Sequence, residues 1–285
     1  PVDKNLSVLA TKRTDRRAMF DWTSKKEIST SQLTNGDFYY GHAVFTADGR
    51  FLVTSTIDRA SRGFIDVLEV PSLKKVASHP VARGVAHEIL GVRDSKFVFC
   101  VDNSAETRPA FGTLDLSSSE FEYFDVPDLA PEKSLTMTHL KDCGDRYVAN
   151  VNIESREGLL DGAVVSLMKS DNSVKTEISM ASHGLESELL SFEYDPVRQF
   201  MWVTVPDKNL IVVWNLATDS LVKEIRLPRA PHSVSFVPSL DLVIVAARTK
   251  FFAFDPRTIE RRETFEANAP NSLLSGGKTS HSRLV

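Results

Sequence analysis

The chain has 285 residues, of which 42% are hydrophobic and 25% are charged, and its formal net charge is -4. This composition is typical of globular proteins that bury a sizeable core. No apolar run approaches the roughly 18 residues that a membrane-spanning helix needs, so we expect no membrane span. The weak negative charge also gives no reason to expect nucleic acid as a partner.

Short apolar runs rich in Val, Ile and Phe dominate the chain, and each is bounded by Asp, Gly, Asn or Pro. They include residues 51–54, 97–99, 201–205, 211–214 and 242–245. Regularly spaced short strands with turn signals between them indicate a sandwich, a barrel or a propeller. Long amphipathic helical patterns are missing, which argues against an α/β fold.

A repeat decides among these folds. From His42 the sequence predicts a strand, an Asp48-Gly49 turn, a second strand, a third strand over 63–70 and a fourth strand. The same order recurs from His87, from His139, from about Ser191 and from His232. Four strands in each repeat of roughly 40–50 residues are typical of propeller blades.

The two ends of the chain complete the repeat. Read from tail to head, residues 281–285 followed by 1–13 parallel residues 232–248. We therefore predict that Leu284 and Val285 pair with residues 6–10, which would leave no free sheet edge. The expected fold is one all-β domain over 1–285, a six-bladed propeller. Its blades are predicted at about 281–285 with 1–36, 37–80, 81–130, 131–184, 185–228 and 229–270.

Several motifs resemble a known family. The stretch from Tyr40 to Arg50 is similar to the family pattern YGHGVFSPDGR, residues 62–67 to GRGVIGVYD, and Gly84 to Glu88 to GPHE. Residues 138–140, 211–215 and 280–285 add looser matches. The family is an uncharacterised group of bacterial periplasmic propeller proteins, often encoded near imelysin-type iron-uptake genes. The resemblance implies a periplasmic or otherwise exported location and an association with iron uptake. Members carry an extra N-terminal blade, so a seven-bladed propeller is the alternative.

Five of the seven histidines share one position, at or near the start of a predicted first strand. First strands line the central channel of a propeller, so these imidazoles should converge at one channel mouth. Neutral imidazole suits zinc, copper, iron and nickel. The predicted metal ligands are His42, His87, His139, His281, His232 and Glu88. A channel mouth that holds water or an anion, and purely structural histidines, remain the alternatives, because duplication of a blade copies a residue whether or not it is used.

The predicted loops between second and third strands carry more cations than carboxylates. The cations that we expect to form a rim for an anionic ligand or partner are Arg59, Arg62, Arg108, Arg156, Lys208 and Arg248. Such a rim would steer anions toward the same mouth. Charged loops without a ligand are the plain alternative. Aromatic residues do not alternate with these cations, so nucleic acid is a poor candidate.

The sequence contains no Gly-x-Ser-x-Gly nucleophile motif, phosphate loop, Cys-x-x-Cys pair or haem-attachment motif. Its two cysteines, Cys100 and Cys143, are expected to stay separate thiols, because one ends an apolar strand and the other lies in a polar turn. The chain opens at Pro1, which we interpret as the start of a mature or trimmed chain.

The sequence favours a non-enzymatic binding or scaffold protein, monomeric and exported. It would hold a transition metal (iron, copper or zinc) in the histidine ring and serve iron handling. Its partner would be a small anionic ligand or an envelope protein. The alternative is a metal-dependent oxidoreductase or hydrolase whose site lies at the same mouth.

Overall fold

The computed structural model describes residues 6–10, 14–93, 95–102, 108–126, 134–154, 160–180 and 187–266. These residues form β-strands and two single-turn 3-10 helices, η2 (Pro206–Lys208) and η3 (Pro238–Leu240), and contain no α-helix. The prediction of an all-β fold is confirmed. No helix in this part of the chain has the length and apolar character to cross a membrane.

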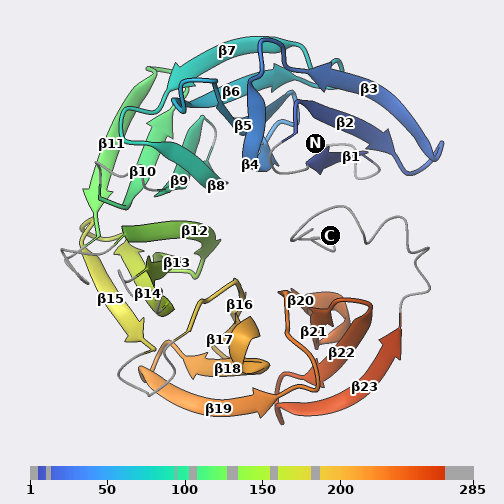
Figure 1. Cartoon of the computed structure of the whole chain (residues 1–285), viewed down its shortest axis with the longest axis vertical. Coiled ribbons are helices and arrows are strands. Elements are labelled where there is room, and N and C mark those ends of the chain that lie inside the picture. The colour runs from blue at the N-terminus through green and yellow to red at the C-terminus, as the bar shows by residue number, and fades with distance from the viewer. Residues whose placement is uncertain are drawn as a thin grey trace. The chain divides into compact units, whose positions relative to one another are not determined.

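The described strands form six antiparallel sheets, which follow one another in the order of the chain (Figure 1). The chain divides into two compact units, one made of residues 1–140 with 170–174 and the other of residues 141–169 with 175–285.

The first unit begins with three antiparallel sheets. The first contains β1 (Leu6–Ala10), β2 (Arg16–Asp21) and β3 (Lys26–Gln32). The second contains β4 (Phe38–Phe45), β5 (Phe51–Ile57), β6 (Gly63–Glu69) and β7 (Lys75–Pro80). The third contains β8 (Val85–Arg93), β9 (Lys96–Asp102), β10 (Ala110–Asp115) and β11 (Glu120–Asp125). As the sequence predicts, β4 and β5 are joined by an Asp48-Gly49 turn, in which Gly49 has a φ of 70°.

The second and third sheets pack against each other through apolar side chains. Val53 and Ile65 of the second sheet share one buried cluster with Ala86, Ile89 and Phe99 of the third. Within this unit β4 and β8 contact each other, and Figure 1 shows them side by side. Because apolar side chains hold the two sheets together, the first strands of both sheets have fixed positions.

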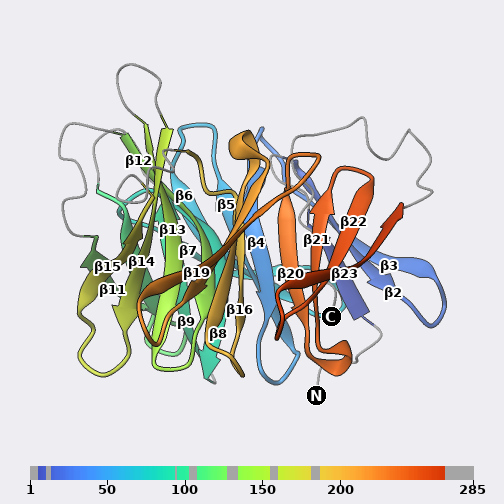
Figure 2. The same cartoon turned by 90° about the horizontal axis from the view of Figure 1, so that it is seen from below.

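The remaining three sheets also follow the order of the chain. One contains β12 (Ser134–Asp142), β13 (Arg146–Glu154), β14 (Leu160–Met168) and β15 (Val174–Ser179). The next contains β16 (Ser191–Asp195), β17 (Phe200–Val205), β18 (Leu210–Asn215) and β19 (Ser220–Arg226). The last, at the right of Figure 2, contains β20 (Ser233–Val237), β21 (Leu242–Ala247), β22 (Lys250–Asp255) and β23 (Glu260–Glu266).

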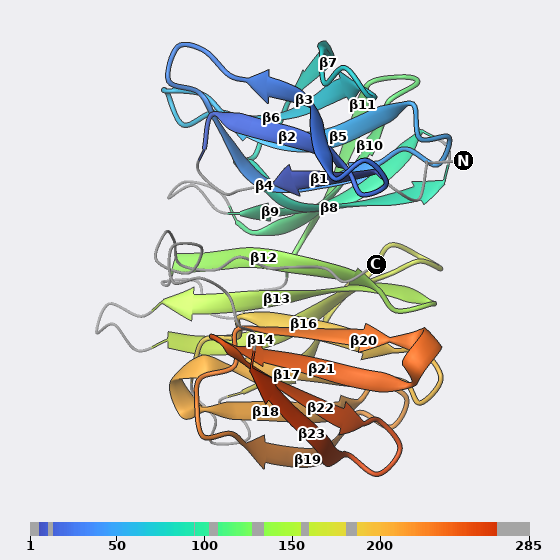
Figure 3. The same ribbon diagram turned by 90° about the vertical axis from the view of Figure 1, so that its right-hand side faces the viewer.

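The last two sheets belong to the second unit and share a core. Trp202 and Val213 pack with Val245, Phe252 and Phe254 in one buried cluster. Strands β16 and β20 contact each other and lie side by side in Figure 3. The inward-facing residues are thus large and apolar, as the alternation of the strands predicts.

The two cysteines are buried and are not joined by a disulfide, as the sequence predicts. Cys100 lies in β9, and Cys143 follows β12 in the turn before β13. Burial raises the pKa of the Cys143 thiol well above its usual range. The predicted pairing of Leu284 and Val285 with residues 6–10 lies outside the described residues.

Candidate metal centre

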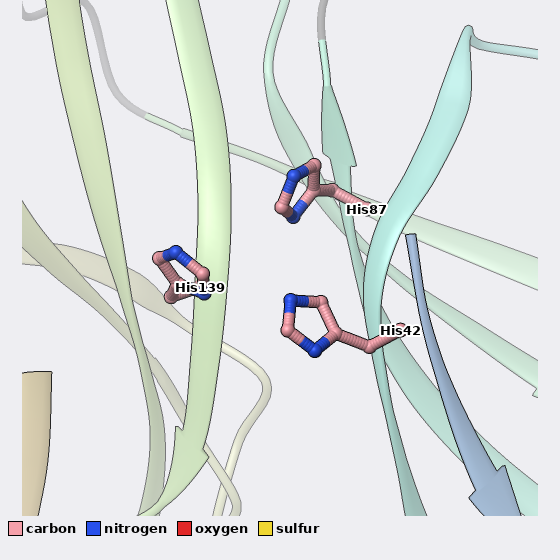
Figure 4. Close-up of side chains that lie close together, drawn as sticks. All are labelled: His42, His87 and His139. Atoms are coloured by element: carbon pink, nitrogen blue, oxygen red, sulfur yellow. The ribbon is translucent and has the colours of Figure 1, made fainter. Parts of the chain in front are cut away.

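Three histidines from three different sheets meet in the first unit. His42 lies in β4, His87 in β8 and His139 in β12, and each strand is the first of its sheet. Figure 4 shows the three rings turned toward a common region. His87 and His139 are buried, whereas His42 is partly exposed. The sequence predicted these three among its metal ligands.

The three rings form a nearly equilateral triangle. The ring centroids of His42 and His87 are 5.6 Å apart, those of His42 and His139 are 5.5 Å apart, and those of His87 and His139 are 5.5 Å apart. One nitrogen from each ring lies within 4.8 Å of the other two. This group could hold a metal ion.

The spacing is close to what a metal requires. Three nitrogens bound tetrahedrally to one ion at about 2.1 Å lie about 3.4 Å from one another. Each pair of nitrogens would therefore have to approach by about 1.4 Å at most. Small rotations of the side chains can supply a movement of this size, so the geometry fits a site that tightens around an ion.

A β-bulge in β8 brings two consecutive residues to His139. Ala86 pairs with Val101 and Ile89 pairs with Phe99, so His87 and Glu88 together lie opposite Cys100. In a regular strand, consecutive side chains point to opposite faces. Here the His87 ring packs against the ring of His139, and the carboxylate of Glu88 also reaches it. The bulge is the feature that breaks the alternation.

A second bulge lies in β4 at His42. Tyr39 pairs with Thr56 and Ala43 with Thr54, so that residues 40–42 together face a single residue of β5. Tyr40 packs edge-on against the His87 ring, with 5.6 Å between the ring centroids. The bulge therefore supplies one candidate ligand, His42, and one aromatic contact that supports a second candidate ligand.

Hydrogen bonds to Nδ1 orient two of the imidazoles. Nδ1 of His87 lies 2.5 Å from the carbonyl oxygen of Thr138. Nδ1 of His139 lies 3.2 Å from Oε2 of Glu88, and the same oxygen accepts a hydrogen bond of 2.9 Å from the backbone N–H of Leu140. Glu88 is itself buried, with 6% of its surface exposed. Both imidazoles are thus oriented by acceptors that do not belong to the group of three histidines.

Cys100 forms hydrogen bonds with the backbone of both β8 and β12. Its thiol donates to the carbonyl oxygen of Thr138 at 3.1 Å, and its sulfur accepts a hydrogen bond of 3.3 Å from the backbone N–H of Glu88. The thiol thereby links the bulge of β8 to β12. Cys100 supports the two histidines without belonging to the group of candidate ligands.

The other predicted ligands are placed differently. Glu88 contacts His139 rather than joining the triangle. His232 is described but does not belong to this group of three, and the strand that follows it, β20, pairs regularly with β21. His281 lies outside the described residues.

The predicted cationic rim is described only in part. Arg62 forms an ion pair of 2.7 Å with Asp58, so its charge is balanced locally. The guanidinium of Arg59 packs on Gly36, where an added Cβ would come within 2.2 Å of Nε. Arg108, Lys208 and Arg248 are described, whereas Arg156 is outside the described residues.

Sequence reasoning missed Tyr40, Cys100 and the backbone of residues 138–140 as parts of the site. Gly41 carried a usable signal, because an isolated glycine inside a strand often marks a bulge. The backbone acceptor at Thr138 carries no sequence signal at all.

Residues 2–264 match the family described as "Protein of unknown function (DUF1513)". The chain belongs to this family. The description of the family assigns no activity, which agrees with the resemblance to an uncharacterised family. No curated protein matches the chain.

Two solved structures share the fold. A chain in the "Crystal Structure of Mitotic Checkpoint Complex" aligns with a TM-score of 0.65 and 12% identity, over 93% of this chain and 76% of that chain. A "functionally unknown protein from Desulfotomaculum acetoxidans DSM 771" aligns with a TM-score of 0.65 and 11% identity, over 93% of this chain and 80% of that chain. At such low identity the likeness concerns the fold alone.

Proposed function

We propose that this protein binds one transition metal ion through His42, His87 and His139. It would act as an exported binding or scaffold protein in metal handling, with iron as the first candidate. The observation that carries the proposal is the triangle of three imidazoles drawn from three separate sheets. Imidazole nitrogen is a good ligand for zinc, copper, iron and nickel, and three converging imidazoles match a common ligand set.

The test is metal binding by the whole chain without an affinity tag. After treatment with a chelator and dialysis, calorimetric titration with Zn²⁺, Cu²⁺ and, under anaerobic conditions, Fe²⁺ should show one ion per chain. The double variant His87→Ala with His139→Ala should lose stoichiometric binding. His79→Ala is the matched control, because His79 lies in the outer strand β7 and outside the group of three. Equal binding by the wild type and the double variant would contradict the proposal.

The second candidate is a metal-dependent hydrolase or oxidoreductase. The observation in its favour is the number of ligands, because three protein ligands leave a coordination position for water or substrate. A zinc-loaded or iron-loaded protein that turns over an ester, a phosphate ester or a small redox substrate would support this candidate. The turnover would have to disappear in the double histidine variant.

The location and partners of the protein rest on the family resemblance. We propose export, association with iron uptake, and a small anionic ligand or an envelope protein as partner. An anion would complete the charge of a metal ion held by neutral imidazoles. Localisation of the full-length gene product by fractionation tests export, and growth under iron limitation without the gene tests the association.

We also propose that the sheets close into a six-bladed propeller, with seven blades as the alternative. The support is the first sheet, which has three described strands where the other five have four. The predicted pairing of Leu284 and Val285 with residues 6–10 would supply its fourth strand.

A further inference from the structure

We propose that Glu88 is a positioning residue that fixes the tautomer of His139, so that the metal is bound through Nε2 of His139 and of His87. This inference rests on the proposed metal binding and specifies how it is achieved. It also assigns a function to the bulge of β8, which would otherwise be a local irregularity.

The ring of His87 forms a hydrogen bond with a backbone carbonyl. The carbonyl oxygen of Thr138 has no proton to give, so at 2.5 Å the proton of the hydrogen bond must be on Nδ1 of His87. A neutral imidazole carries one N–H and one lone pair. The lone pair of His87 is therefore on Nε2, the nitrogen on the other side of the ring.

The ring of His139 has a side-chain carboxylate as its acceptor. Oε2 of Glu88 already accepts from the N–H of Leu140 at 2.9 Å and lies 3.2 Å from Nδ1 of His139. An ionised carboxylate is only an acceptor, so it favours the proton on Nδ1 and leaves the lone pair on Nε2. The backbone contact holds the carboxylate in place, which makes Glu88 a rigid partner for the ring.

The hydrogen bond to the carboxylate also strengthens the ligand. A carboxylate that accepts from the second nitrogen of a metal-binding histidine fixes the tautomer and the orientation of the ring. Loss of such a partner typically weakens metal affinity by about 10–100-fold. His87 has a neutral carbonyl in the equivalent place, so the two histidines should differ in how readily a side-chain substitution disturbs them.

The experiment uses the full chain labelled with ¹⁵N-histidine. Long-range ¹H–¹⁵N spectra of the metal-free protein, at a pH where the imidazoles are neutral, report which nitrogen of each ring carries the proton. We expect protonated Nδ1 in both His87 and His139, and Zn²⁺ should then shift the Nε2 signals. Protonated Nε2 in His139 would overturn the inference.

Glu88→Ala tests the positioning role. It should mix the tautomers of His139, leave the His87 signals unchanged and weaken Zn²⁺ binding by about 10–100-fold. A change in the tautomer without a loss of affinity, or a loss of affinity without a change in the tautomer, would overturn the role. Glu88→Gln, which keeps the shape and one oxygen acceptor, should partly restore the affinity and serves as the second variant if the alanine variant fails to fold.

Asp66→Asn is the matched control. Asp66 is another fully buried carboxylate of the first unit, and it accepts from Thr56, Lys75 and Ser78 rather than from a histidine. The substitution Asp66→Asn should leave both the His139 signals and the affinity for Zn²⁺ unchanged. If the wild type binds none of the metals, the proposed function fails, whereas the spectrum of the metal-free protein still tests the tautomers on their own.

Discussion

Gly63 and Gly84 approach so closely that no side chain fits between them. A Cβ at position 63 would lie 2.2 Å from the carbonyl oxygen of Gly84 and 2.8 Å from the Cα of Val85. Gly63 begins β6 and Val85 begins β8, the strand that carries His87. This contact therefore fixes the position of the first residue of β8.

We expect Gly63→Ala to destabilise the fold, because the clash is with backbone that cannot rotate away. Overpacking of this kind costs about 1–3 kcal/mol. Gly91→Ala is the control, since an added Cβ there would lie 3.7 Å from the Phe97 ring and 4.0 Å from the carbonyl oxygen of Phe45, both ordinary contacts. Urea unfolding of both variants should show a lower free energy of unfolding than that of the wild type for Gly63→Ala alone. Equal stability of the two would mean that β8 is not held at this point.

Two asparagines of β13 bind the backbone of Leu189 with unequal consequences. Asn152 donates to the Leu189 carbonyl at 3.1 Å and accepts from its N–H at 2.9 Å, and Asn150 donates to the same carbonyl at 2.8 Å. Leu189 is fully buried. Asn152→Ala should cost about 1–3 kcal/mol, because it leaves the N–H of Leu189 without its acceptor.

Asn150→Ala should cost less than Asn152→Ala, since the carbonyl of Leu189 keeps its bond from Asn152. The two substitutions remove the same number of atoms from the same strand, so each is the control for the other. Guanidinium chloride unfolding gives both free energies. A larger loss for Asn150→Ala would contradict this account.

Asp115 makes part of the stability dependent on pH. Hydrogen bonds from the Ser117 hydroxyl, from the Ser95 hydroxyl and from the backbone N–H of Ser117 lower the pKa of Asp115 from 3.8 to about 2. Because the folded pKa lies below the unfolded one, the unfolded state binds more protons between these values. The stabilisation of the folded state by the ionised carboxylate of Asp115 is present above about pH 4 and is lost as the pH falls toward 2.

Asp115→Asn should therefore lower the thermal midpoint at pH 5–7, and the difference from the wild type should shrink as the pH approaches 2. Midpoints measured from pH 7 down to pH 2.5 test this. Ser117→Ala removes the hydroxyl that does most to lower the pKa of Asp115, so it should reproduce part of the loss in thermal midpoint. A difference in midpoint that stays constant from pH 7 to pH 2.5 would show that ionisation of the Asp115 carboxylate does not stabilise the fold.

The proposed closure predicts a large effect of a short truncation. Deleting residues 281–285 should lower the thermal midpoint by many degrees, because the first sheet would lose a strand and expose its edge. Replacing the same residues by a Gly-Ser segment of equal length keeps the length of the chain and should be as damaging. An unchanged midpoint in either variant would exclude the closure with residues 6–10.

Much of the fold could be predicted from the sequence because turns and alternation act locally. The apolar run 211–214 lies inside β18, and the Asp48-Gly49 turn joins β4 to β5. Such signals depend on a few neighbouring residues. The repeat places a histidine at or near the start of the first strand in five of the six predicted blades, so that His42, His87 and His139 could be named as candidate ligands together.

The details of the site could not be predicted in the same way. The repeat also put His232 before a first strand, yet β20 pairs regularly and the group of three does not include His232. The role of Glu88 depends on the bulge, because strict alternation would direct Glu88 away from the face of His87. A bulge reflects pairing between strands, and the sequence of one strand does not determine it.

The two bulges also make the candidate centre depend on how many residues a strand contains. Removing one residue from the pair 87–88 would make the ladder between β8 and β9 regular over residues 85–91, and a shift by one residue turns a strand's side chains to the opposite face. A relative could thus keep all three histidines and still lose the arrangement through the deletion of a single codon. Divergence within this family should therefore be judged by strand length at these two places as well as by the histidines themselves.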